Sequence, residues 1–199
     1  MLNVVDIEIV GNFSALCRER GKIVPGTRRE GHNVFTSNGR NWLSKLIAWQ
    51  TIGSTDAPYT RRRARWMGVG TGSQFEVTTV AALNAPALVN ATDYLATIDS
   101  VTFPTLSSVK FTKEFAGSEI SFSGSTVEVT EAGLYVDVNP AEIAAPCAAY
   151  TGTEDAEASG ETTTLDPNVG SNPPVAYKVF EALPKTPDFI LEINWEFRF

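Results

Sequence analysis

The chain has little cysteine and histidine and no long apolar run. Only Cys17 and Cys147 occur among 199 residues, far apart and without CxxC spacing, so neither a disulfide framework nor a zinc site is indicated. With His32 as the single imidazole, most metal-binding and catalytic-triad schemes are excluded. No run of about 18 apolar residues exists, and the N-terminus lacks the basic start of a signal peptide. We therefore expect no metal, no cofactor and no membrane segment in a protein made in the cytoplasm.

The charges are acidic overall but unevenly distributed. The formal net charge is −7, which argues against general affinity for nucleic acid or anionic membranes. Residues 1–65 hold eleven basic and five acidic groups, whereas residues 66–199 hold five basic and eighteen acidic groups. Faces of opposite sign would let the protein pack against copies of itself or against another assembly.

The composition and the apolar patterns predict one mostly-β domain over residues 1–199. Apolar residues make up 43% of the chain, which is typical of globular proteins. Trp42, Leu43, Leu46 and Ile47 share one helical face, with Ser37 or Asn38 as the predicted N-cap. The predicted strands after the segment Trp66–Gly72 are 98–103, 109–115, 120–122, 127–129, 134–138, 175–180 and 189–199.

Short, turn-rich separations between these strands indicate an antiparallel arrangement rather than βαβ units. We therefore expect an antiparallel, jelly-roll-like sandwich with one short helix and long loops. Residues 11–37 contain four glycine and proline residues between 21 and 31 and read as an extended arm or loop. Residues 151–174 carry five acidic groups, no basic group and no aromatic residue, and read as an acidic loop insertion.

Two motifs invite a chemical interpretation, and neither supports catalysis. The glycines of Gly68–Gly72 have neither the spacing nor the lysine of a nucleotide-binding loop, so we expect them to form a tight turn with close backbone approach. Glu128 lies on the predicted strand 127–129 and Glu131 shortly after it, and we expect both to face solvent rather than to act as paired catalytic or calcium-binding carboxylates. The protein is therefore not expected to be an enzyme.

Charged clusters are the better candidates for function. Four arginines in five residues favour contact with an acidic protein surface, with a solvated loop or nucleic acid as alternatives. An acidic counterpart in a neighbouring copy could come from the loop at 151–174. The predicted interface residues are Arg61, Arg62, Arg63, Arg65, Arg28, Arg29, Glu154, Asp155 and Glu157.

The order of four motifs resembles a family of structural proteins from the virions of tailed bacteriophages. The motifs are Thr36-Ser37-Asn38-Gly39-Arg40-Asn41-Trp42-Leu43, Trp66-Met67-Gly68-Val69-Gly70-Thr71-Gly72, Glu131-Ala132-Gly133-Leu134-Tyr135, and Lys185-Thr186-Pro187 with the Trp195 strand that follows. They cover about residues 36–72, 131–138 and 175–199. The expected Leu-x-x-Glu element after the glycines is replaced by Ala82-Leu83-Asn84-Ala85-Pro86.

This resemblance implies a non-catalytic protein of the virion, made in the cytoplasm of the host. A head decoration (cement) protein that binds the major capsid protein and stabilises the particle is the first expectation, as a homo-oligomer such as a trimer. A tail, tail-fibre or baseplate component is the alternative. A carbohydrate-binding or carbohydrate-cleaving module for host recognition is a third interpretation.

Overall fold

The computed structural model describes residues 9–48, 63–72, 74–90, 92–121, 125–138, 140 and 165–199. Its elements, in chain order, are β1 (Val10–Glu19), β2 (Lys22–Ile23), β3 (Arg29–His32), β4 (Val34–Phe35), α1 (Ser37–Ala48), β5 (Ala64–Gly70), β6 (Ala96–Thr97), β7 (Ser100–Thr105), β8 (Ser108–Phe115), β9 (Val127–Val136), β10 (Ala176–Lys185) and β11 (Ile190–Arg198).

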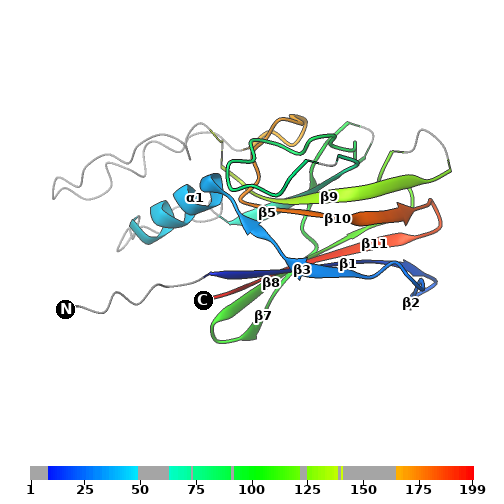
Figure 1. Cartoon of the computed structure of the whole chain (residues 1–199), viewed down its shortest axis with the longest axis horizontal. Helices are drawn as coiled ribbons and strands as arrows, with labels where there is room; N and C mark the ends of the chain where they lie inside the picture. Colours follow the sequence, from blue (N-terminus) through cyan, green and yellow to red (C-terminus); the bar gives the residue numbers. More distant parts are fainter. Residues whose placement is uncertain are drawn as a thin grey trace.

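Two antiparallel sheets pack face to face (Figure 1). Sheet A has the order β2-β1-β11-β8-β7, with β3 also paired to β1, and sheet B has the order β4-β10-β9-β5-β6. The prediction of a mostly-β antiparallel sandwich with one short helix is confirmed. No helix in the described ranges is long and apolar enough to cross a membrane.

The first strands pair with the last strands in both sheets. β1 pairs with β11 in sheet A, and β4 pairs with β10 in sheet B. The chain changes sheets at Asn33, directly between β3 and β4, so one side of the sandwich is closed by continuous backbone. This crossing places β3 next to both sheets.

The predicted arm at residues 11–37 is wrong, because most of it belongs to the sheets. β1 runs along the whole of β11 in register, from Val10 opposite Arg198 to Arg18 opposite Ile190. Its inward side chains Phe13, Ala15 and Cys17 are buried in the core. Glycine does mark a turn after β1, where Gly21 adopts a φ of 79°.

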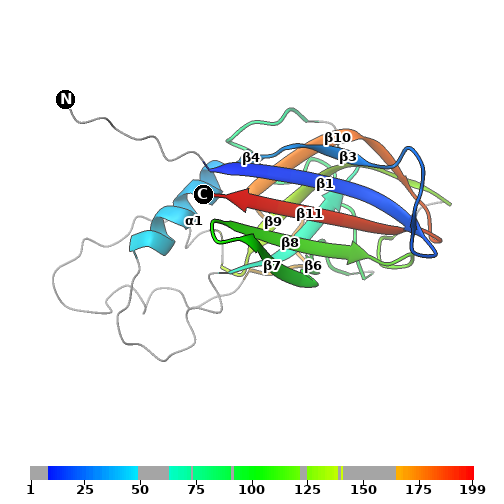
Figure 2. The ribbon, with the colours of Figure 1, turned by 90° about the horizontal axis from the view of Figure 1, so that it is seen from below.

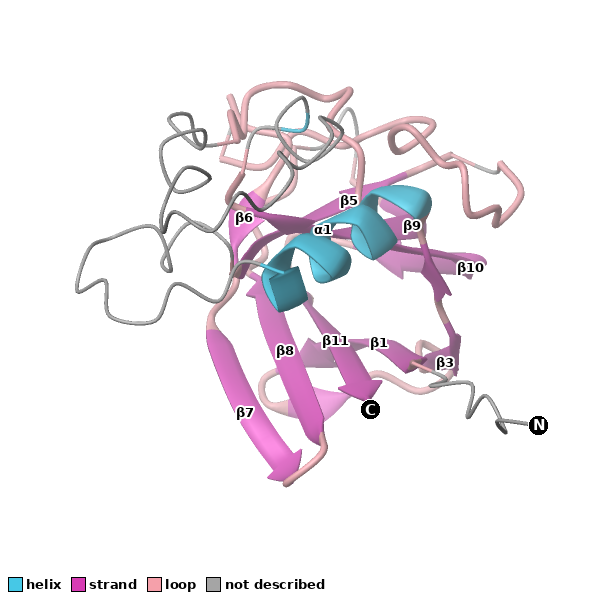
Figure 3. Cartoon of the chain, turned by 90° about the vertical axis from the view of Figure 1, so that its left-hand side faces the viewer, coloured by secondary structure: helices cyan, strands magenta, loops and turns pink. Residues whose placement is uncertain are grey.

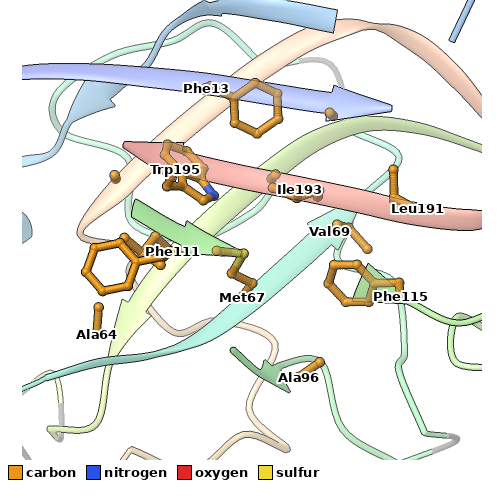
Figure 4. Close-up of a cluster of buried hydrophobic side chains, with 14 of the residues drawn as sticks. Phe13, Ala64, Met67, Val69, Ala96, Phe111, Phe115, Leu191, Ile193 and Trp195 are labelled. Carbon is orange, nitrogen blue, oxygen red and sulfur yellow. The ribbon is translucent and has the colours of Figure 1, made fainter. Parts of the chain in front are cut away.

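The core between the sheets is one continuous apolar cluster. Trp195 is fully buried at its centre, with the Phe13 ring packed edge-on at 5.0 Å between ring centroids (Figure 4). β11 supplies alternate residues to this core, as its sequence parity predicts: Leu191, Ile193, Trp195 and Phe197. Trp42, on the predicted apolar face of α1, packs against the same cluster.

The central strand β9 of sheet B is buried on both faces over residues 131–136. β9 is one continuous strand rather than the two predicted ones, and its residues 131–136 are all buried. Loops from residues 74–95 and 165–175 lie over the outer side of β9 and β10 (Figure 1). They form a second apolar cluster of Val80, Leu83, Leu95, Tyr135, Leu165 and Tyr177. A strand buried on both faces shows no polar alternation, which explains why the sequence pattern split it in two.

The helix α1 is confirmed, but its N-cap differs from the prediction. Thr36, rather than Ser37 or Asn38, caps the helix, because its hydroxyl accepts a hydrogen bond from the Gly39 N–H at 3.0 Å. The Asn38 amide instead donates to the Pro173 carbonyl at 3.1 Å. The start of α1 is thereby tied to the segment that leads into β10.

The predicted acidic insertion at 151–174 ends earlier than expected. Residues 165–174 pack on the body, since Leu165 is 3% exposed and the Pro167 carbonyl accepts a hydrogen bond from the Tyr94 N–H. Residues 151–164 lie outside the described residues. The buried side chain of Leu165 anchors residues 165–174 to the body, which the acidic composition of 151–174 did not predict.

Cys17 is a buried thiol, as expected, whereas Cys147 lies outside the described residues. The Cys17 Sγ lies 3.6 Å from the Pro184 carbonyl, and burial raises the pKa of the thiol to about 11. Lys185 follows on β10, and its ammonium donates to the Gly117 and Thr186 carbonyls. Burial lowers the pKa of Lys185 to about 8. Both shifts follow from the low polarity of the core, which disfavours charge.

The Ile193→Ala variant tests the role of the β11 core positions. Because Ile193 is fully buried, we expect the free energy of unfolding to fall by about 2–5 kcal/mol. Arg198→Ala on the same strand removes a side chain that is 62% exposed, and should change stability by less than about 0.5 kcal/mol. Urea unfolding of both variants checks this, and equal losses would contradict the assigned core.

Candidate protein interface

Two predicted interface residues, Arg28 and Arg29, are adjacent but play different parts. Arg28 is exposed and pairs with Glu30 on the surface. Arg29 is only 17% exposed, and its guanidinium donates to the carbonyls of Glu181 and Ala182 at 3.1 and 2.9 Å. These carbonyls lie where β10 shifts register against β9. Arg29 therefore hydrogen-bonds to the carbonyls of a β-bulge in β10 and ties β3 to sheet B.

The predicted Arg65 is likewise held within the chain. Its Nη1 lies 2.6 Å from Oδ2 of Asp137, whose side chain is only 4% exposed, and its guanidinium stacks over the Trp66 ring. The Trp66 indole N–H donates to the other Asp137 oxygen at 3.1 Å. The pair neutralises a buried carboxylate, while 38% of the Arg65 side chain stays exposed, so its predicted interface role stays a prediction. Arg63 is exposed and is positioned at the start of β5.

The remaining predicted residues lie outside the described part of the chain. They are Arg61, Arg62, Glu154, Asp155 and Glu157. The predicted pairing between the arginine cluster and the acidic loop of a neighbouring copy stays a prediction. Of the described members, Arg28 and Arg63 are exposed and Arg65 is partly exposed.

The glycines at 68–72 do not form the predicted tight turn. Gly68 and Gly70 lie within β5, and none of the three glycines has a positive φ. Their role is close approach, since a Cβ at Gly70 or Gly72 would lie 2.5 Å from Oε1 of Glu131. Replacing either glycine would therefore displace the Glu131 carboxylate.

Glu131 is the residue that sequence reasoning placed wrongly, because it is fully buried rather than solvent-facing. Its Oε1 accepts hydrogen bonds from the N–H groups of Gly72 and Ala85 at 3.1 and 2.8 Å. Its Oε2 accepts from the Asn84 N–H at 3.1 Å and from the Tyr177 hydroxyl at 2.7 Å. Burial, together with this hydrogen bond, raises the pKa of Tyr177.

This carboxylate occupies a cradle of backbone N–H groups that could otherwise hold an anion. Its oxygens are engaged by four donors, so it holds the covering loop on sheet B. No group of three or more His, Cys, Asp or Glu side chains within the described ranges is arranged to hold a metal ion.

The surface feature that sequence reasoning missed is an apolar patch on the β7–β8 hairpin. We define the hairpin patch as Val101, Phe103, Leu106 and Phe199. Phe103 is 75% exposed and Leu106 fully exposed, and the Phe199 N–H donates to the Ser107 carbonyl in the hairpin turn. β7 lies at the border of sheet A, away from sheet B (Figure 3).

The patch is exposed because sheet B does not extend over β7. Val101 is opposite Phe111, so it lies on the sheet face that packs on the core elsewhere, yet it is 46% exposed. The border strand of sheet B, β6, has only two residues. Pro104 lacks an N–H, and the β7–β8 register shifts beyond Thr102. These two features interrupt the hydrogen-bonding edge of β7, so pairing of a further strand with it is disfavoured. The patch is thus suited to side-chain contacts with a partner.

Comparisons with protein-family models, with curated proteins and with solved structures found no match to this chain. The structure itself defines an antiparallel β-sandwich whose β7–β8 hairpin exposes apolar side chains.

The Glu131→Gln variant tests whether the buried carboxylate holds the covering loop. The new amide nitrogen would face N–H donors and could not accept their hydrogen bonds. We therefore expect the free energy of unfolding to fall by about 2–4 kcal/mol and hydrogen exchange at Gly72, Asn84 and Ala85 to become faster. Tyr177→Phe removes one of the four hydrogen bonds, so its free energy of unfolding should fall by about 1 kcal/mol. Urea unfolding and residue-resolved exchange make the comparison. Unchanged exchange at these three amides would contradict the assignment.

Proposed function

We propose that this protein is a structural component of a tailed-bacteriophage virion that acts by binding, without catalysis. In this proposal it is a head decoration protein that contacts the major capsid protein on the outside of the particle and associates with copies of itself. The hairpin patch is the observation that carries the proposal. It gives the β-sandwich an apolar contact site along the β7–β8 hairpin.

The exposed apolar side chains of the patch would contribute favourable free energy when a partner buries them. Burying one large apolar side chain contributes about 1.5–3 kcal/mol, so Phe103 and Leu106 together offer about 3–6 kcal/mol. Repeated copies on a particle would add to this through avidity. Exposed apolar side chains clustered in this way are typical of protein-binding sites, whereas singly scattered ones are not.

The motif order described above supports a virion role, and the acidic surface supports a protein partner rather than nucleic acid. A tail, tail-fibre or baseplate position is the alternative within the same class. The two positions differ in copy number, because a head surface repeats far more often than a tail.

Mass spectrometry and particle imaging of virions from the phage that encodes the chain test the proposal. We expect the protein in purified particles, on the head exterior, in numbers comparable with the major capsid protein. A few copies or a few tens would assign it to the tail instead. Absence of the protein from purified virions would refute the virion role altogether.

The Phe103→Asp/Leu106→Asp double variant tests the hairpin patch. We expect at least a tenfold loss of affinity for particles that lack the protein, because two apolar contacts are replaced by charge. The matched control is Ile23→Asp on β2, which changes a side chain that is 44% exposed at the opposite end of sheet A (Figure 1). Co-sedimentation with particles measures both variants. Equal binding by the double variant and the wild type would rule out docking through this hairpin.

A further inference from the structure

The outer face of sheet A carries an open depression of about 380 Å³. Loops cover the outer face of sheet B, whereas β1, β11 and β8 lie open to the viewer in Figure 2. Side chains from four strands line the depression: Asn12 and Ser14 of β1, Glu30 and His32 of β3, Lys110 of β8, and Asn194, Glu196 and Arg198 of β11. The hairpin patch contributes none of these residues.

The strand registers align these side chains in two adjacent rows across the sheet. The first row runs His32, Asn12, Glu196 and Lys110, each opposite the next on the neighbouring strand. The second row runs Glu30, Ser14, Asn194 and Thr112. Each row crosses four strands, a length of about 14 Å, and the rows are about 7 Å apart. All eight side chains are polar.

The two rows differ in how far their hydrogen-bonding groups are already engaged. In the second row, Thr112 donates to Asn194 at 2.7 Å, and Asn194 also contacts Ser14 and Glu192. In the first row, Glu196 pairs with Arg198. The side chains of Asn12, His32 and Lys110 make no hydrogen bond to another residue in the described part of the chain. The first row therefore presents an amide, an imidazole and an ammonium to a ligand.

The charges of the lining select among ligand classes. The carboxylates of Glu30 and Glu196 oppose an anionic ligand such as a phosphate, and the cations of Lys110 and Arg198 oppose a cationic one. The rows expose no large apolar side chain for a hydrophobic ligand, since Phe13 is only 3% exposed. A neutral molecule that is rich in hydroxyl groups can both donate to the carboxylates and accept from the amide and ammonium.

We propose that this depression binds a neutral oligosaccharide, aligned along the row His32-Asn12-Glu196-Lys110. The sugar hydroxyls form hydrogen bonds with this row. The second row, in which Ser14 and Thr112 are hydrogen-bonded to Asn194, forms the fixed base of the depression. The half-buried Asn12, Glu196 and Lys110 lie on regular strands, so their positions are set before a ligand arrives. This site is independent of the virion proposal, since it shares no residue with the hairpin patch.

An array of neutral and anionic oligosaccharides identifies the probe, and titration calorimetry with the best neutral one measures affinity. We expect binding to weaken at least tenfold in Asn12→Ala and in His32→Ala. Glu114→Ala, which removes an exposed carboxylate of β8 elsewhere on the outer face, should bind as the wild type does. Thermal unfolding of each variant verifies that it folds.

Three outcomes would overturn this assignment. They are the failure of every neutral oligosaccharide to bind at millimolar concentration, unchanged affinity in both depression variants, and displacement of the bound sugar by inorganic phosphate at equal concentration. The assignment is supported if Asn12→Ala and His32→Ala lose binding while Glu114→Ala keeps it.

Discussion

The carboxylate of Glu131 accepts four hydrogen bonds in a site that solvent does not reach. A buried charge of this kind is tolerated only when its donors are fixed in place, so the position of the covering loop, the glycines of β5 and Tyr177 all depend on it. The covering loop in turn buries a second apolar cluster on the outer side of sheet B. The covering loops therefore bury residues 131–136 of β9, while Glu181 and Ala182 of β10 and Phe75 on a covering loop stay exposed.

Sheet A has the opposite arrangement, with only its inner face buried. Its outer face is polar over four strands, and its border strand β7 carries apolar side chains that sheet B does not cover. Both proposed binding surfaces, the hairpin patch and the depression, lie on sheet A. The ion pairs Arg65–Asp137 and Lys113–Glu119, each with one nearly buried partner, stabilise the body rather than extend outward.

Much of the fold follows from local patterns, and the rest depends on contacts that are distant in sequence. β11 was predictable because large apolar residues alternate along it without interruption. β1 was not, because its buried positions include Ala15 and Cys17, which signal a core less strongly than the residues of β11. Arg29 and Arg65 resembled docking groups, but their partners lie more than 70 residues away in the chain.

Amide hydrogen exchange of the protein, free and bound to purified particles, tests most directly the claim that binding occurs on one side of a fixed sandwich. Docking through the hairpin patch predicts new protection at residues 100–107 and at Phe199, with exchange in β9 unchanged. New protection confined to the loops over sheet B, with none in the hairpin, would contradict the account.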